Sequence, residues 1–347
     1  MKIGVMSFAH THAVGYTTLL KGMGVEVLTC DPDRDSSVEG EVRGAEMAAQ
    51  LGVDHVDTYE ELFAWGPDAV VICSENTRHR RDTELAASHG VHVLCEKPLA
   101  TTVADAEAMI EACEQAGVLL MTAFPVHFSP QAAQAKAAVE SGQVGELMAA
   151  LGTNNGYCPV GVRAWFLDPQ WSGGGCLVDH TVHVAELLHH ITGARPVVVN
   201  AVKNQIMHAE LPGVMAETGG LVTITYDNGF KASIDCSWSV PQHAPTWGGL
   251  TLELVGRTGV VEVDAFATRV GGWDSRHNGR DFWLPFGTDM DAELLRTFVG
   301  AVEGRLAGGN DPAPAPDGNV GLLTTAIVQA ARESAETGQP VEVSLPG

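Results

Sequence analysis

The sequence predicts an α/β protein with two domains, an N-terminal doubly wound parallel sheet and a C-terminal α+β domain built on an open antiparallel sheet. The chain has 347 residues, which is more than one hydrophobic core usually holds. Its first third alternates short apolar runs with helix-like stretches, the order that a parallel sheet with crossover helices requires. Longer β-like segments replace this pattern from about residue 124, so we expect domains at 1–123 and 124–347.

In the first domain, apolar runs bounded by turn residues predict five strands, at Lys2 to Ser7, Glu26 to Cys30, Ala69 to Cys73, His92 to Cys95 and Val118 to Thr122. Apolar spacing predicts helices between them, at Thr11 to Lys21, Ala45 to Leu51, Arg78 to His89 and Val103 to Ala116. Gly52 and Gly117 follow two of these helices, where a residue with positive φ is favoured.

In the second domain, a helix is expected from about Pro130 to Ser141. The β-like segments that follow are Leu147 to Asn154, Val197 to Met207, Gly220 to Tyr226, Lys231 to Val240, Thr251 to Val255 and Val260 to Val263. The Asn228-Gly229 pair predicts a tight hairpin and hence antiparallel pairing. Pro312, Pro314 and Pro316 form a stiff connector before a last helix at Gly318 to Thr337.

Composition narrows the class of protein. The chain has 43 acidic and 20 basic side chains and a formal net charge of -23, which makes attraction to nucleic acid or an anionic membrane unfavourable. Its apolar stretches are too short to cross a bilayer, and no signal peptide opens the sequence, so we expect a cytoplasmic protein. The seven cysteines are an odd number without paired spacing, which indicates reduced core residues rather than a disulfide framework.

A dinucleotide site is predicted where the first strand ends. A Rossmann domain holds the dinucleotide pyrophosphate at this turn, usually with glycines. Here the turn reads Ser7-Phe8-Ala9-His10-Thr11-His12 and contains no glycine. Ser7 and Ala9 are small enough for a close approach, and His10 or His12 adds a donor or else only packs at the start of the helix. We assign Ser7, Phe8, Ala9 and His10 to cofactor binding.

Asp31 follows the second strand, at the distance from the turn where an acidic residue binds the adenosine ribose hydroxyls. Its carboxylate favours NAD, because it repels the 2′-phosphate of NADP. Arg34 lies nearby and keeps NADP possible. The alternative is that Asp31-Pro32 only forms a turn.

Three further motifs resemble the glucose-fructose oxidoreductase / inositol dehydrogenase family (Gfo/Idh/MocA). They are the segment around Glu96-Lys97-Pro98, the loop from Ser74 through Asn76 to His79, and the run from Gly173 to His183 with its three glycines. The resemblance spans nearly the whole chain; the glycine-free first turn departs from it. It implies an NAD-dependent oxidoreductase with Ser74, Asn76, His79, Glu96 and Lys97 near the cofactor, and often a cis bond before Pro98.

The same motifs supply acid-base chemistry. Oxidation of a secondary alcohol needs a base for the hydroxyl proton while hydride leaves the same carbon. By the resemblance, Lys97 and His183 do this work and Asp179 orients the substrate or the histidine; how the proton is shared between Lys97 and His183 stays open. Asp179 and His183 are four residues apart and so face one side of a helix. We expect Lys97 and His183 to meet at the nicotinamide.

The resemblance implies substrate contacts at His127 and His183. Arg163 and Trp165 are predicted as further contacts, because aromatic faces suit sugar rings and arginine suits their hydroxyl groups. The histidines His180, His183, His189 and His190 could instead bind a metal near Asp179. No cysteine pair accompanies them, and the resemblance already gives Asp179 and His183 a role, so we expect no metal. The expected substrate is a sugar or polyol and the expected assembly a homodimer or homotetramer. Redox-neutral chemistry on tightly bound NAD, and a catalytically silent sugar or nucleotide sensor, remain alternatives.

Overall fold

The computed structural model describes residues 1–33, 35–38, 40–161, 163–274 and 280–345. These residues form two compact units. Unit 1 consists of Met1–Phe124, Val160–Gly173 and Asp291–Thr325, and unit 2 of Pro125–Pro159, Gly174–Met290 and Ala326–Gly347. Neither unit is a continuous stretch of chain, so the division at 123/124 stays a sequence-based prediction. Arg34, the residue that kept NADP possible, lies outside the described residues.

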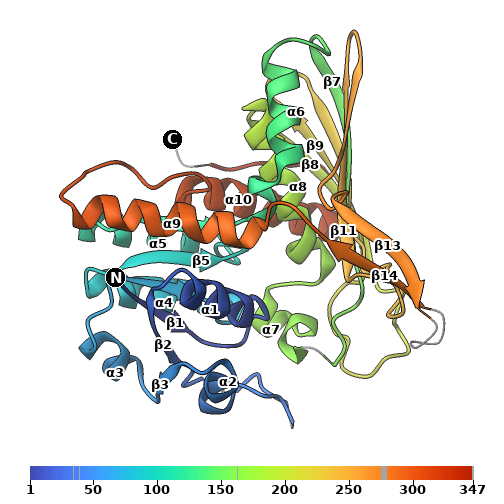
Figure 1. The fold of residues 1–347 in the computed structure, drawn as a ribbon. Coiled ribbons are helices and arrows are strands. Elements are labelled where there is room, and N and C mark those ends of the chain that lie inside the picture. The colour runs from blue at the N-terminus through green and yellow to red at the C-terminus, as the bar shows by residue number, and fades with distance from the viewer. Residues whose placement is uncertain (34, 39, 162, 275–279, 346–347) are drawn as a thin grey trace. The chain divides into compact units, whose positions relative to one another are not determined.

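Unit 1 is built on a six-stranded parallel sheet, whose strands run from blue to teal in Figure 1. Its strand order is β3-β2-β1-β4-β5-β6, which confirms the doubly wound fold. The strands are β1 (Lys2–Met6), β2 (Glu26–Cys30), β3 (Asp54–Val56), β4 (Ala69–Ile72), β5 (His92–Glu96) and β6 (Leu120–Ala123). The chain reverses direction across the sheet between β1 and β4, and ligands of such sheets bind beside the carboxyl ends of the strands at this point.

The crossover helices of unit 1 are α1 (His12–Gly22), α2 (Gly44–Leu51), α3 (Tyr59–Ala64), α4 (His79–Ser88) and α5 (Val103–Ala116). Strand β3 and helix α3 were not predicted, because each is too short to show a period. Helix α3 did carry a signal: Thr58 and Glu61 form a capping box at its start. The helix α9 (Met290–Leu306) was also missed.

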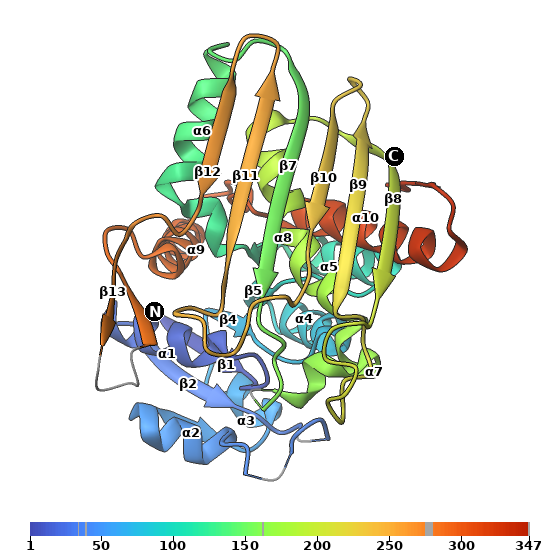
Figure 2. The same cartoon turned by 90° about the vertical axis from the view of Figure 1, so that its right-hand side faces the viewer.

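Unit 2 contains a seven-stranded sheet in the order β12-β11-β7-β10-β9-β8-β15. Its strands are β7 (Leu147–Gly156), β8 (Pro196–Asn204), β9 (Gly219–Tyr226), β10 (Lys231–Asp235), β11 (Gly248–Gly256), β12 (Val260–Asp264) and β15 (Val341–Glu342). Neighbouring strands are antiparallel except β7 and β10, which are parallel. Figure 2 shows this sheet face on, with α6 (Pro130–Glu140) and α8 (Cys176–Thr192) behind it. Further elements are the hairpin β13 (Arg269–Asp274) and β14 (Arg280–Pro285) and the helices α7 (Pro169–Ser172) and α10 (Gly318–Thr337). Short 3-10 helices lie at Asn76–Arg78, Pro125–Phe128 and Ala164–Leu167.

The hairpin prediction at Asn228-Gly229 is confirmed. Strands β9 and β10 pair in antiparallel fashion around this turn, and Gly229 has a φ of 86°. Strand β10 ends at Asp235 and not at Val240 as predicted, because the Asp235 carboxylate accepts hydrogen bonds from the amide and hydroxyl of Ser237 and forms a turn.

All seven cysteines are buried and form no disulfide, as expected. In the described part of the chain, no helix has the length and apolar content needed to span a bilayer.

Candidate active site

The turn after β1 adopts a glycine-like shape although it contains no glycine. Ser7 has a φ of 73°, in the left-handed region that side chains rarely occupy. Its amide donates to the Cys30 carbonyl, and its hydroxyl accepts a hydrogen bond from the amide of Ala9. Phe8 is fully buried, so its side chain packs in the core. The turn therefore has the backbone geometry of a dinucleotide loop without its usual residues.

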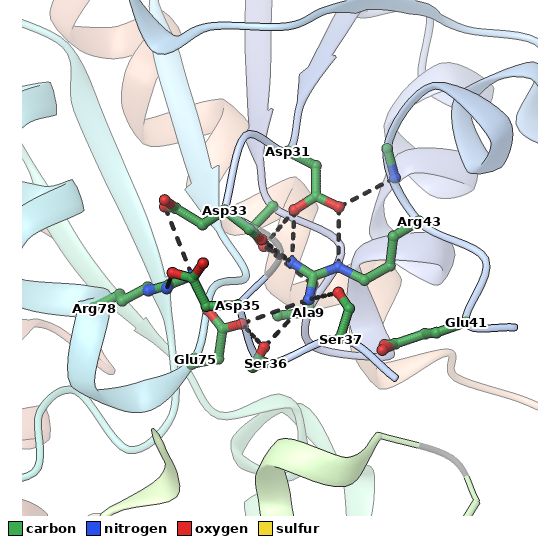
Figure 3. A network of polar contacts seen from close by, with 12 residues as sticks. Ala9, Asp31, Asp33, Asp35, Ser36, Ser37, Glu41, Arg43, Glu75 and Arg78 are labelled. Carbon is green, nitrogen blue, oxygen red and sulfur yellow. Dashed lines mark hydrogen bonds and ion pairs between the residues drawn. The ribbon is translucent and has the colours of Figure 1, made fainter. Parts of the chain in front are cut away.

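A buried ion pair holds this turn (Figure 3). Both carboxylate oxygens of Asp31 accept from the Arg43 guanidinium, at 2.7 and 3.0 Å, and neither side chain is exposed. The remaining contacts of the Asp31 carboxylate are the Ser7 hydroxyl at 2.9 Å and the Gly44 amide at 3.1 Å. A carboxylate accepts about four hydrogen bonds. Among the described residues, these contacts leave Asp31 no acceptor for a ribose hydroxyl in this conformation, and they fix the turn after β1 instead.

The charge around this pair is predominantly negative. Arg43 also contacts Glu75 at 3.5 Å, and Glu75 pairs in turn with Arg78. Burial alone would lower the pKa of Arg43, but its hydrogen bonds to Asp31 and the charges of Asp31 and Glu75 raise it. Arg78 also lies near two further carboxylates, Asp33 and Asp35.

Two histidines of the turn gather on Glu96, the last residue of β5. The His12 Nδ1 atom lies 2.8 Å from Glu96 Oε1, and the His10 Nδ1 atom lies 3.8 Å from the same oxygen. Burial alone would raise the pKa of Glu96, but His10 and His12 hold it well below its usual range. For His12 the directions are reversed: burial alone would lower its pKa, but the Glu96 carboxylate raises it. Sequence reasoning left the role of these histidines open; both serve as partners of Glu96.

Lys97 directly follows this carboxylate. Its amide donates to Glu96 Oε2 at 3.0 Å, only 5% of its surface is exposed, and the Lys97-Pro98 bond is cis, as the family resemblance implied. The structure therefore places Lys97 at the carboxyl edge of the parallel sheet, where an α/β fold binds its ligand.

The loop after β4 supports the same edge. His79 is fully buried, and its ring contacts the carbonyl of Pro98 at 2.9 Å and that of Ser74 at 3.1 Å. The Asn76 Nδ2 atom donates to the carbonyl of Ser172 at 2.8 Å. Among the described residues, the Asn76 Oδ1 atom is buried without a hydrogen-bond partner, whereas the Ser74 side chain bonds to the Asp82 carboxyl group. His79 thus positions the loop, while Asn76 keeps a polar atom available.

Arg163 and Trp165, predicted to contact substrate, bind the turn after β1. Arg163 Nε and Trp165 Nε1 both donate to the carbonyl of Ala9, at 3.0 and 2.9 Å. Arg163 also pairs with Glu41 at 3.1 Å, and Trp165 is 1% exposed. Their segment folds with unit 1 although it lies far from the turn in sequence, which is why sequence spacing did not reveal the contact.

In unit 2, the glycine run forms the entry to α8. A Cβ atom on Gly175 would lie 2.0 Å from the carbonyl oxygen of Glu217, and the Gly175 amide donates to the Glu217 side chain at 2.7 Å. Asp179 and His183 follow on one face of the helix. The Asp179 Oδ2 atom lies 3.2 Å from Nε2 of His180, one of the histidines that the sequence analysis weighed as metal ligands.

His127, the other predicted substrate residue, lies against the second half of α8. Its Nδ1 atom is 2.6 Å from Glu186 Oε1, and its ring centroid is 3.9 Å from that of His190. Burial lowers the pKa of His190 to about 4, with smaller contributions from His127 and Lys136. These contacts give His127 partners that sequence reasoning did not foresee.

The residues of unit 1 fit a dinucleotide. Helix α1 starts directly after the Ser7 turn, and a helix N-terminus suits a pyrophosphate. Its N-cap residue Thr11 makes no side-chain capping bond, but its first amide, that of His12, donates to His10 Nδ1. Among the described residues, the unpaired Asn76 Oδ1 atom lies in the loop after the neighbouring strand β4.

Comparison with known proteins agrees with this geometry. The family model described as "Oxidoreductase family, NAD-binding Rossmann fold" matches residues 33–124, and that of the GFO/IDH/MocA C-terminal domain matches residues 132–262. The chain belongs to the Gfo/Idh/MocA oxidoreductase family. Its N-terminal unit is an NAD-binding Rossmann domain.

Individual relatives span the whole chain. A 1,5-anhydro-D-fructose reductase of Ensifer adhaerens is 28% identical over 98% of this chain and 97% of its own length. A myo-inositol 2-dehydrogenase of Thermotoga maritima is 28% identical over 87% and 88%. The crystal structure of GenD2 from gentamicin A biosynthesis, in complex with NAD, matches with a TM-score of 0.84 at 22% identity over 99% and 97% of the two chains. This last likeness concerns the fold.

Proposed function

We propose that this Gfo/Idh/MocA protein transfers a hydride between NAD and a secondary alcohol of a sugar, cyclitol or related polyol. The observation that carries the proposal is the buried Lys97, which follows Glu96 at the carboxyl edge of the NAD-binding sheet. A lysine kept from bulk water next to a carboxylate is suited to proton transfer. The sugar and cyclitol names of the relatives support the substrate class.

Each group has a part in this chemistry. The nicotinamide supplies the hydride acceptor or donor. Lys97 and His183 take the proton of the substrate hydroxyl during oxidation and return it during reduction, and Asp179 orients the substrate or the histidine. The substrate contact of His183 follows from the same assignment. Trp165 is buried and His127 is held by Glu186, so we leave both out of the substrate contacts; Arg163 remains a proposed one.

The Ser7 turn and the start of α1 hold the pyrophosphate, and Asn76 offers a further polar atom to NAD. NAD rather than NADP is favoured because acidic residues outnumber basic ones around Asp31. We also propose a homodimer or homotetramer. Leu151, Val202 and Leu221 are about half exposed on one face of the seven-stranded sheet and suit a contact between copies, which light scattering would test.

The test is a screen of polyols and aldoses with NAD and NADP. The reaction is monitored by the absorbance of the reduced nicotinamide. Lys97→Met should lower kcat at least about 100-fold, the scale of general acid-base catalysis, while the Kd for NAD changes little. Lys231→Met, which removes an exposed lysine of β10, is the matched control and should retain full activity.

The alternatives give different results in the same experiments. Redox-neutral chemistry would show as nucleotide released when the purified protein is heat-denatured, without net reduction of added NAD. A silent sensor would bind its ligand yet show no turnover, and Lys97→Met would change no measured activity. Either result would contradict the proposed dehydrogenase.

A further inference from the structure

A cluster outside the proposed reaction lies at the junction of α8 with the short helix at Pro125–Phe128. It consists of His127, Glu186 and His190, each of which offers one ligand atom within 4.8 Å of the others. Glu186 and His190 are four residues apart on α8 and therefore face the same side, toward His127. All three residues belong to unit 2.

The burial of this cluster calls for a partner. The side chain of Glu186 is 2% exposed and that of His127 is 11% exposed. A buried carboxylate is costly unless it is paired or bound to a metal. Within the described ranges its hydrogen-bond partner is His127, at 2.6 Å.

A simple ion pair would need only one histidine. The second ring, that of His190, lies with its centroid 3.9 Å from the ring of His127. In the part of the chain that the structure describes, neither nitrogen of His190 has a hydrogen-bond partner. The cluster therefore holds one imidazole more than the carboxylate requires, at a distance where both rings can turn a nitrogen toward one point.

We propose that His127, Glu186 and His190 form a zinc site. Two imidazole nitrogens and one carboxylate oxygen are a common protein ligand set for Zn²⁺, and a water molecule completes a tetrahedral site. The ion would take the place of the proton between His127 and Glu186, whose ligand atoms would separate to about 3.3 Å to suit zinc bonds of about 2.0–2.2 Å. The expectation of no metal, drawn from the sequence, weighed His190 together with His180, His183 and His189, and did not foresee that His127 and Glu186 lie beside His190.

The donor set also selects the class of metal. Mg²⁺ and Ca²⁺ prefer oxygen ligands, whereas two of these three donors are nitrogen. A second group, His10, His12 and Glu96, also meets the distance condition. Its histidines belong to the Ser7 turn after β1, where His10 Nδ1 already accepts a hydrogen bond from the amide of His12. We therefore do not assign a metal to this group.

The test uses the full chain, stripped with a chelator and titrated with ZnCl₂ by calorimetry without NAD. We expect one zinc ion per chain and an unfolding midpoint that rises with zinc concentration; MgCl₂ should do neither. His190→Gln should weaken zinc binding by more than about 100-fold, because even losing an outer partner of a ligand costs about 10- to 100-fold. Glu186→Gln should do the same.

Two matched variants locate the ion. His189→Gln changes the neighbouring histidine of α8, and His12→Gln disables the other group; both should keep stoichiometric zinc binding. The proposal is overturned if the wild type takes up no stoichiometric zinc, or if His190→Gln binds zinc as the wild type does. Loss of zinc in His12→Gln alone would likewise overturn it. If Glu186→Gln does not fold, zinc titration of His190→Gln still tests the proposal, because His190 is only half-buried. Circular dichroism should confirm that this variant is folded.

Discussion

Replacing Arg43 by methionine tests whether its buried ion pair with Asp31 stabilises the Ser7 turn after β1. The guanidinium donates to both oxygens of Asp31, to the Ser7 hydroxyl at 3.0 Å and to the carbonyl of Asp33 at 3.0 Å. Methionine fills much of the same volume but leaves the Asp31 carboxylate buried without a counter-charge. Removing one member of a buried pair costs about 3–5 kcal/mol of unfolding free energy.

That loss would lower the unfolding midpoint by roughly 6–20 °C, if the unit that contains the pair unfolds with the 2–4 °C per kcal/mol typical of about 150–250 residues. The affinity for NAD should fall too, because Ser7 loses the contacts that hold its left-handed backbone. Thermal unfolding and calorimetric titration with NAD measure the two effects separately. Titration below the lowered midpoint ensures that the protein is folded.

The matched control is Arg80→Met. Arg80 is also an arginine of unit 1 with two carboxylate partners, Glu84 and Asp105, but its side chain is 46% exposed. Solvent screens such pairs, so this variant should keep the wild-type midpoint and NAD affinity. Our reading of the network is refuted if Arg43→Met unfolds at the wild-type temperature and binds NAD equally well.

Three further changes test neighbouring steps. Ser7→Gly relieves about 1–2 kcal/mol of left-handed strain but removes hydrogen bonds of about 1 kcal/mol each. Because these effects offset each other, NAD titration should show less than a tenfold change in Kd. A larger loss of affinity would contradict a glycine-like turn. His12→Gln should lower the unfolding midpoint more at pH 6 than at pH 9. The raised pKa of His12 stabilises the fold below about pH 6.5, and this stabilisation is lost as the pH rises. An equal decrease of the midpoint at both pH values would contradict the pairing with Glu96. Gly175→Ala should unfold at a clearly lower temperature, since its Cβ would lie 2.0 Å from a backbone oxygen, whereas Gly15→Ala, with open space around it, should not.

Local patterns were enough for the framework of the fold. The apolar runs of β1, β2, β4 and β5 and the hairpin at Asn228-Gly229 each lie within a few residues of sequence, and all were predicted correctly. Strand β3 with three residues and helix α3 with six were missed, because so few residues repeat the hydrophobic period too seldom to reveal it.

The site was harder to predict, because its contacts join residues that are far apart in the chain. Asp31 was expected to bind ribose from its distance to the turn, but nothing near it in sequence indicated that Arg43 would occupy its oxygens. The contacts of Arg163 with Ala9, and of His127 with Glu186, likewise depend on the path of the chain and not on local composition.

The buried network explains how a turn without glycine can keep a glycine-like backbone. Glycine reaches positive φ because it has no Cβ, so the turn needs no external support. Here Ser7 reaches the same conformation with a side chain that Asp31 and Arg43 hold in place. The residues that stabilise this backbone conformation therefore lie 24 and 36 positions away from Ser7. A search for glycines in the turn cannot find them. The same network occupies the carboxylate that would otherwise bind ribose, so the NAD preference of this chain should depend on the acidic field around the turn more than on one Asp31 contact.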